Sequence, residues 1–125
     1  MNTRKALICD DDRTLVRLLR MILAKQGFTV LEAADGACGL AMIRAERPEL
    51  VLLDLNMPVK DGVAVLTEIQ AGGIGGAYII VLSATDRGEL DARVRGLGAS
   101  ELMTKPFNPM EFGRRVERMI AEGKI

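Results

Sequence analysis

The 125-residue sequence contains no histidine and no tryptophan. The absence of histidine removes the usual general base, the Ser/His/Asp and Cys/His nucleophile systems, and histidine-based zinc sites. Any chemistry that the chain performs must therefore use carboxylates, hydroxyl groups, lysine or the backbone. This is a strong restriction on the kinds of site that the chain can build.

Cysteine, net charge and long apolar runs are also scarce or missing. The two cysteines, Cys9 and Cys38, do not have metal-ligand spacing, and Cys9 lies in an apolar run typical of a core. Lys plus Arg and Asp plus Glu number 17 each, so charge predicts no nucleic-acid or membrane partner. No apolar run approaches the ~20 residues of a membrane span, and the polar start MNTRK lacks a signal-peptide core. We expect a reduced, cytoplasmic protein.

The residues that are present, 49% hydrophobic and 27% charged, are typical of one globular domain over residues 1–125. A chain of this length can bury a core without disulfides or a structural metal. Strand-length apolar runs alternate with segments of helical period. The predicted strands are Lys5–Cys9, Thr29–Glu32, Leu50–Asp54, Ala77–Leu82 and Glu101–Thr104. The predicted helices are Asp12–Gln26, Gly36–Arg47, Gly62–Ala71, Arg87–Leu97 and Pro109–Ala121.

The order is βα repeated five times, which predicts an α/β fold with a parallel sheet covered by helices on both faces. The near-continuous apolar runs ELVLLD and AYIIVL agree with strands buried on both sides. The glycine-rich stretch AGGIGGA (71–77) precedes a strand and lacks the GxGxxG and GK[ST] patterns, so we interpret it as a helix-to-strand connection.

Polar side chains follow four of the predicted strands, and ligand sites in parallel α/β sheets lie at that edge. Each residue has an ordinary alternative role. Aspartate after a strand is a common turn former or helix N-cap, which we expect of Asp12, and a serine or lysine there is commonly a turn or surface residue. Their joint occurrence favours one site. Its candidate residues are Asp10, Asp11, Asp54, Asn56, Ser83 and Lys105.

Read as one site, these residue types have complementary chemistry. Oxygen ligands suit Mg²⁺, and a bound cation would relieve the repulsion between carboxylates, which is roughly 4 kcal/mol for a pair about 4 Å apart. An ionised carboxylate can act as a nucleophile and form an aspartyl-phosphate without a general base. Ser83 and Lys105 could stabilise the phosphoryl oxygens.

The sequence resembles the receiver domain of bacterial two-component response regulators over essentially its whole length. The resemblance rests on ICDDD after the first strand, LLDLNMP followed by DG, then VLSA and TKPF, in the family's order and spacing. It implies a three-layer, flavodoxin-like (βα)5 fold with a five-stranded parallel sheet of order 2-1-3-4-5.

The resemblance also implies a role for each site residue. Asp11 would contact Mg²⁺ directly, Asp10 largely through water, and Asn56 through its backbone carbonyl. Asp54 would be the phosphoacceptor and a further metal ligand.

In the same family, Ser83 is the hydroxyl switch residue and Lys105 the phosphate-binding lysine, followed by a cis bond to Pro106. The family commonly has Tyr or Phe two residues into the fifth strand, where this sequence has Leu102. We therefore expect the phosphorylation chemistry to be retained and the output switch to be weaker, altered or read elsewhere.

The function implied is that of a stand-alone phosphoacceptor, not an enzyme. Its partners would be a sensor histidine kinase or histidine phosphotransfer protein and an unidentified downstream protein. Three alternatives stay open: a receiver cut from a longer regulator or hybrid kinase, a metal-dependent aspartyl phosphohydrolase, and an interaction module that is not phosphorylated. The oligomeric state is also open, with a monomer as one outcome.

Overall fold

The computed structural model describes residues 4–57, 59–73, 76–84 and 88–125, which form five strands alternating with five helices. None of the helices in these ranges is long and apolar enough to cross a membrane. In chain order the elements are β1 (Lys5–Cys9), α1 (Arg13–Lys25), β2 (Thr29–Ala33), α2 (Gly36–Glu46), β3 (Leu50–Asp54), α3 (Gly62–Ala71), β4 (Tyr78–Ser83), α4 (Gly88–Gly96), β5 (Glu101–Thr104) and α5 (Pro109–Ala121).

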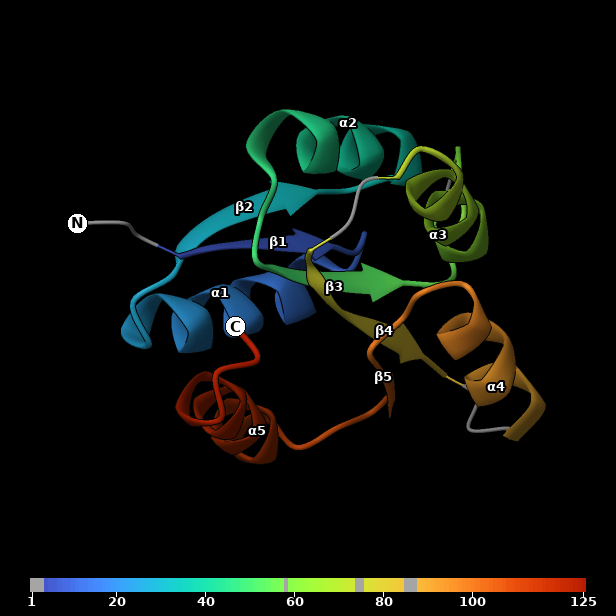
Figure 1. Ribbon diagram of the computed structural model, residues 1–125. Coiled ribbons are helices and arrows are strands. Elements are labelled where there is room, and N and C mark those ends of the chain that lie inside the picture. The colour runs from blue at the N-terminus through green and yellow to red at the C-terminus, as the bar shows by residue number, and fades with distance from the viewer. Residues whose placement is uncertain (1–3, 58, 74–75, 85–87) are drawn as a thin grey trace.

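The five strands form one parallel sheet of order β2-β1-β3-β4-β5 (Figure 1). This order brings β1 and β3 side by side, although a helix, a strand and a second helix separate them in sequence. The predicted α/β class and the flavodoxin-like order 2-1-3-4-5 are confirmed.

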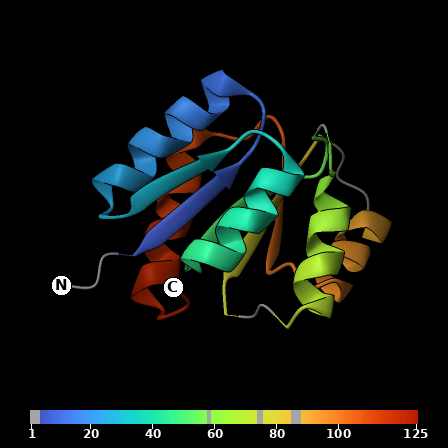
Figure 2. The same ribbon diagram turned by 90° about the horizontal axis from the view of Figure 1, so that it is seen from above.

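Two apolar cores lie on opposite faces of the sheet, because successive side chains of a strand point to opposite sides. In β1, Ala6 and Ile8 join the core under α1 and α5, while Leu7 and Cys9 join the core under α2, α3 and α4. Figure 2 shows these two groups of helices on either side of the strands. Strands buried on both faces explain why the central runs are apolar at every position.

Polar residues in the loops that follow the strands start four of the helices. The side chains of Asp12, Asp35, Asp61 and Asn108 are N-caps, and each accepts a hydrogen bond from at least one backbone N–H group of its helix. The predicted capping role of Asp12 is confirmed. At the other end of α1, Gly27 has a φ of +92°, a conformation that glycine adopts without a steric penalty.

The predicted bounds of β1, β3, α3, β5 and α5 match the observed ones, and the described ends of the other elements differ by one residue. β2 extends one residue further to Ala33, which pairs with Cys9, and β4 spans Tyr78–Ser83 because Ser83 pairs with Thr104. The predicted start of the fourth helix at Arg87 lies outside the described residues. So does the middle of the 71–77 connection, residues 74–75, although α3 ends at Ala71 as expected.

Candidate functional site

The carboxyl ends of four neighbouring strands meet at one edge of the sheet. Cys9, the last residue of β1, pairs with Leu53 of β3, so Asp10 and Asp54 follow equivalent positions on adjacent strands. Asp54 pairs with Leu82 of β4, the residue before Ser83. The parallel register alone therefore places the strand-terminal polar residues next to one another.

Three carboxylates gather at this edge. Asp10, Asp11 and Asp54 each offer an oxygen, and the three oxygens lie within 4.8 Å of one another. Asp10 and Asp54 are only 2% and 5% exposed, whereas Asp11 is exposed. Two buried unit charges 4.8 Å apart repel by about 3.5 kcal/mol at an effective dielectric constant of about 20. A cluster of this kind needs positive charge nearby.

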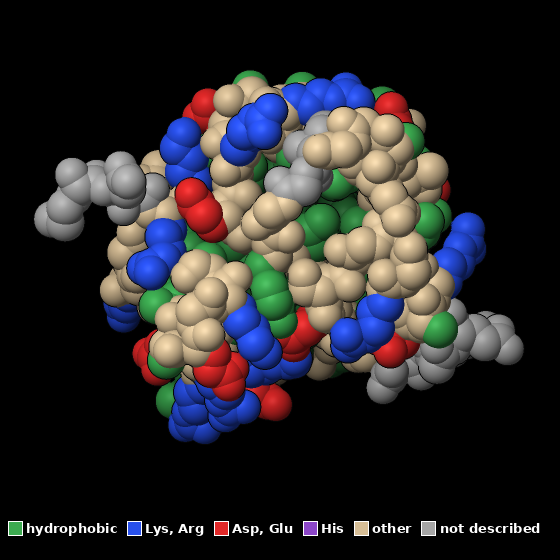
Figure 3. Space-filling model, in the orientation of Figure 1, with side chains coloured by type: hydrophobic (Ala, Val, Ile, Leu, Met, Phe, Trp, Pro, Cys, Tyr) green, Lys and Arg blue, Asp and Glu red, His purple; other side chains and the backbone are tan. Residues whose placement is uncertain are grey.

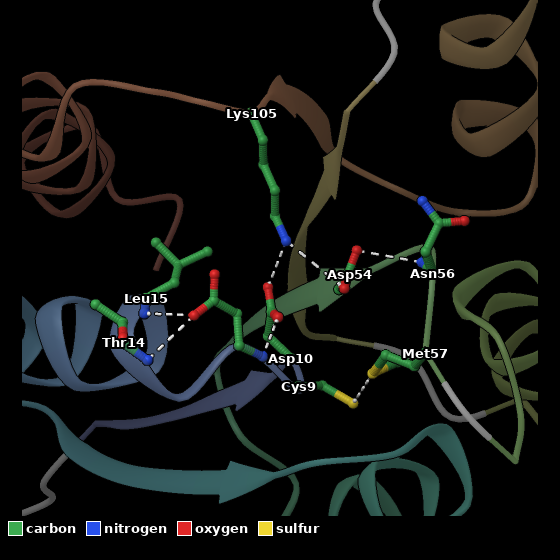
Figure 4. Close-up of polar contacts among 9 residues, drawn as sticks. Cys9, Asp10, Thr14, Leu15, Asp54, Asn56, Met57 and Lys105 are labelled. Carbon is green, nitrogen blue, oxygen red and sulfur yellow. Dashed lines mark hydrogen bonds and ion pairs between the residues drawn. The ribbon is translucent and has the colours of Figure 1, made fainter.

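Lys105 supplies one positive charge, reaching into the cluster from the loop after β5 (Figure 4). Its Nζ donates to Asp10 Oδ2 at 2.8 Å and lies 3.6 Å from Asp54 Oδ2. Burial alone would lower the pKa of Lys105, but the hydrogen bond and charge of Asp10, together with Asp54, raise the pKa overall. The lysine is therefore protonated at neutral pH, and with all three carboxylates ionised the four groups carry a net charge of −2.

Asp54 lies in an environment that disfavours its ionised form. Its pKa is raised, mainly by burial and further by the charges of Asp10 and Asp11. Two contacts act in the opposite direction: the Asn56 N–H donates to Asp54 Oδ1 at 3.2 Å, and the Lys105 charge favours the carboxylate. A cation bound at the cluster would add to these two effects.

Both carboxylate oxygens of Asp10 already have hydrogen-bond donors. Asp10 Oδ1 accepts from the Asp12 N–H at 2.9 Å, and Oδ2 accepts from Lys105. The carboxylate of Asp12 instead caps α1, accepting from the N–H groups of Thr14 and Leu15. The three consecutive aspartates thus divide into two members of the cluster and one helix cap.

The remaining predicted site residues lie close by. Ser83 is 1% exposed, and its backbone carbonyl accepts from the Lys105 N–H at 2.6 Å, which ties β4 to the loop that carries the lysine. The Lys105–Pro106 peptide bond is cis, as the resemblance implies. Asn56 has an exposed side chain that points away from the carboxylates in Figure 4, so the described contact of Asn56 with the site is through its backbone.

Two features of the site were not assigned by the sequence reasoning. The first is the hydrogen bond from Lys105 to Asp10, because the lysine was expected to face a phosphoryl oxygen. The second is Gly62, where a Cβ atom would lie 2.6 Å from the Asp54 carbonyl oxygen and 2.8 Å from the Leu55 Cα. The Asp-Gly pair after LLDLNMP was its signal, since glycine is typical where two backbones approach closely.

The response regulator receiver domain family model matches residues 6–117. The chain belongs to this family. Receiver domains are signalling domains of two-component systems, so the sequence resemblance is confirmed. Among solved structures, the receiver domain of Francisella response regulator 1452 has a TM-score of 0.86 at 27% identity, covering 98% of this chain and 99% of that one. The Vibrio cholerae chemotaxis protein CheY4 has a TM-score of 0.84 at 26% identity, with 94% and 98% covered.

Curated relatives of this receiver are longer proteins. The alkaline phosphatase synthesis transcriptional regulatory protein PhoP of Bacillus subtilis is 36% identical over 124 residues, which are 98% of this chain and 50% of PhoP. The transcriptional regulatory protein PrrA of Mycobacterium tuberculosis is 39% identical over 118 residues, 93% of this chain and 49% of PrrA. The receiver therefore spans about half the length of these relatives.

Leu102 takes the place of the family's common aromatic residue in β5. It is half-buried and packs against the core under α2, α3 and α4, as do Leu90 in α4 and Leu97 just after the end of α4. A leucine in this place fills apolar space but offers neither a ring nor a hydroxyl group to the site.

Proposed function

We propose that this receiver is a Mg²⁺-dependent phosphoacceptor of a two-component phosphorelay, phosphorylated on Asp54. The observation that carries the proposal is the placement of the Asp54 carboxylate within 4.8 Å of two other carboxylates and 3.6 Å from Lys105. One buried nucleophile, an acidic cluster and a fixed cation form the set of groups needed to bind and accept a phosphoryl group. The donor would be a sensor histidine kinase or a histidine phosphotransfer protein.

The donor set fits a hard divalent cation. Carboxylate oxygens at this spacing are ligands that Mg²⁺ prefers, and the net charge of −2 matches its charge. We infer that Asp11 and Asp54 hold the ion directly, together with the backbone carbonyl of Asn56. Asp10, whose oxygens already accept two hydrogen bonds, would hold it through water. When bound, Mg²⁺ neutralises charge on the carboxylates and on the incoming phosphoryl oxygens.

The chain's own residues then perform the transfer. An ionised Asp54 oxygen attacks phosphorus while the bond from phosphorus to the donor's nitrogen breaks, and no proton has to leave the nucleophile. The Lys105 ammonium pairs with one phosphoryl oxygen, and the Ser83 hydroxyl donates to another.

Incubation with Mg²⁺ and acetyl phosphate, followed by intact-mass measurement, tests the proposal. The wild type is expected to gain the mass of one phosphoryl group, and Asp54→Asn to gain none. Asp61→Asn is a matched control, since an asparagine side chain would still cap α3 and the position lies outside the cluster. An unmodified wild type, or an undiminished adduct on Asp54→Asn, would show that the proposal is wrong. Rapid turnover of generic phosphate esters would instead favour a phosphohydrolase.

We further propose that the receiver acts as a stand-alone unit that signals through protein contacts. The longer relatives keep a second arrangement open, in which the same unit is part of a longer regulator. An immunoblot of the source cell separates the two, because a stand-alone receiver migrates at 13.6 kDa and a regulator of the relatives' length at about twice that mass.

A further inference from the structure

A pocket of about 420 Å³ adjoins the candidate site, between the N-terminal half of α1 and the end of β2. Asp10 and Asp11, two members of the carboxylate cluster, form part of its wall, so the pocket and the phosphoacceptor site share residues. Its volume is typical of pockets that bind small molecules, which measure roughly 300–1,000 Å³. We call it the α1 pocket.

Most of the charged groups in the α1 pocket are already balanced. Arg20 pairs with Glu32 of β2, and both residues line the pocket. Asp10 accepts a hydrogen bond from Lys105. The carboxylate of Asp11 is a ligand of Mg²⁺ under the proposed function. With these groups paired, the pocket has no unbalanced negative charge.

Two arginines in the wall of the α1 pocket remain without a partner. Arg13 and Arg17 lie four residues apart on α1, so they are neighbours on one face of the helix. Both are exposed, and neither has an ion pair with any residue that the structure describes. Guanidinium groups bind carboxylates and phosphates through two parallel hydrogen bonds. The two arginines therefore offer an anion-binding position next to the carboxylate cluster.

An apolar part of the wall completes the α1 pocket. Val16, Ala33 and Ala34 line it together with the charged residues. Their side chains offer neither a hydrogen-bond donor nor an acceptor, so they suit a hydrocarbon group better than a sugar or a peptide backbone. The pocket thus combines a cation-binding cluster, an apolar surface and an anion-binding position.

We propose that the α1 pocket binds the tail of a small phosphodonor, namely an acyl phosphate that carries a second negative group. The phosphoryl group would lie at the carboxylate cluster, the hydrocarbon spacer against the apolar wall, and the second anion at Arg13 and Arg17. This inference rests on the proposed function and deepens it by naming a class of small-molecule donor.

The transfer from such a donor balances without a further reactant. An Asp54 oxygen attacks phosphorus, and the bond between phosphorus and the acyl oxygen breaks. The electron pair of that bond leaves with the acyl group as a carboxylate, and no proton is transferred. The released product is a dicarboxylate when the tail of the donor is itself a carboxylate.

The charge of the cluster makes a preference for such a donor informative. Asp10, Asp11, Asp54 and Lys105 together carry a net charge of −2, which one Mg²⁺ brings to zero. A second negative charge on the donor therefore gains nothing from the cluster itself. Faster labelling by the more anionic of two similar donors would have to come from positive charge outside the cluster.

Two donors that differ by one carboxylate, benzoyl phosphate and para-carboxybenzoyl phosphate, test the inference. Each is incubated at low concentration with the full chain and Mg²⁺, and intact mass follows the phosphoryl adduct with time. The wild type is expected to react about fivefold faster with the carboxylated donor, since two exposed guanidinium–carboxylate pairs contribute about this much to binding. This ratio should fall toward one at high salt and in Arg13→Gln/Arg17→Gln. Because the ratio is taken within each variant, a general effect of the arginines on the cluster cancels.

Arg114→Gln/Arg118→Gln on α5 is the matched control. These two arginines are also exposed and four residues apart, and they lie outside the α1 pocket. Figure 3 shows basic and acidic side chains crowded together at the lower left, the part of the view that α5 occupies in Figure 1. The control removes the same amount of positive charge, and its ratio is expected to equal that of the wild type.

Three results would overturn the inference: equal rates of wild-type labelling by the two donors, a preference that persists in Arg13→Gln/Arg17→Gln, or an equal loss of preference in the α5 control. Equal rates would reject the donor class and leave the phosphoacceptor proposal intact, because labelling itself would still occur. A wild type that neither donor nor acetyl phosphate labels would reject both proposals. The two failures are therefore distinguishable.

Discussion

Replacing Asp54 by asparagine is expected to stabilise the metal-free receiver. At an effective dielectric constant of about 20, the Asp10 charge within 4.8 Å repels the Asp54 carboxylate by about 3.5 kcal/mol. The Lys105 charge at 3.6 Å attracts the same carboxylate by about 4.6 kcal/mol. Asp11 adds a repulsion that solvent screens, because its side chain is exposed. The pairwise terms nearly cancel, so the cost of burying the charge decides the sign.

The net destabilisation that Asp54→Asn would remove is about 1 kcal/mol, since desolvation of a carboxylate exceeds the gain from one charge-assisted backbone hydrogen bond by about this amount. The melting temperature in EDTA should rise by about 3 to 5 °C for a domain of this size. Asp12→Asn is the matched control, because asparagine caps a helix as well as aspartate does and Asp12 lies outside the cluster. Its melting temperature is expected to stay within about 1 °C of the wild type.

The pH dependence follows from the raised pKa of Asp54. A carboxyl group with a raised pKa in the folded state costs stability as the pH rises above its unfolded pKa of 3.8. The gain in unfolding free energy from Asp54→Asn should therefore be largest at neutral pH and decrease as the pH falls toward about 4. Mg²⁺ at about ten times its dissociation constant should stabilise the folded wild type by ~1.4 kcal/mol and the variant by less. A variant that melts below the wild type in EDTA at neutral pH would refute this electrostatic reasoning.

Three further predictions concern the reactivity of the cysteines, the packing of Gly62 against β3 and the ion pair of Lys105. Thiol alkylation followed by mass spectrometry should label exposed Cys38 and spare Cys9, because burial raises the pKa of Cys9 to about 12. Gly62→Ala should lower the free energy of unfolding in urea by about 2 kcal/mol, since its Cβ would clash with the β3 backbone, whereas Gly96→Ala, with open space around it, should be neutral or stabilising. Lys105→Met should cost about 2 kcal/mol in the same assay by leaving a buried carboxylate unpaired, and an unchanged midpoint would contradict the pairing.

The sequence pattern predicted the sheet because every strand carries its own local signal. The runs before Asp10 and Asp54 are apolar at every position, as burial on both faces requires, and a capping residue or glycine marks most helix ends. The end of β2 carries no such signal, because Ala33 belongs to the strand only through its pairing with Cys9 across the sheet. Such pairings depend on contacts between distant residues, which local periodicity does not contain.

The membership of the candidate site could be predicted, but its internal contacts could not. Parallel strands of known order must bring Asp10, Asp54 and Ser83 to one edge, so topology was sufficient to group them. Whether the Lys105 ammonium hydrogen-bonds to Asp10 or to Asp54 depends on side-chain conformations. Asp10 lies 95 residues away in sequence, so local patterns do not reveal this contact. The resemblance implied a phosphoryl oxygen as the ligand of Lys105 and gave no sign of the hydrogen bond to the Asp10 carboxylate.

The pairing of Lys105 with two carboxylates leads us to expect that phosphorylation of Asp54 would act on α5 through this lysine. A phosphoryl group carries a charge of about −1.5 to −2 at pH 7, more than the single charge of Asp10, so phosphorylation of Asp54 should draw the lysine away from Asp10. The Lys105 backbone is bonded to Ser83 on one side and leads to the Asn108 cap of α5 on the other. Because Leu102 provides no aromatic ring to move, we expect this short covalent path to be the most direct route from Asp54 to α5.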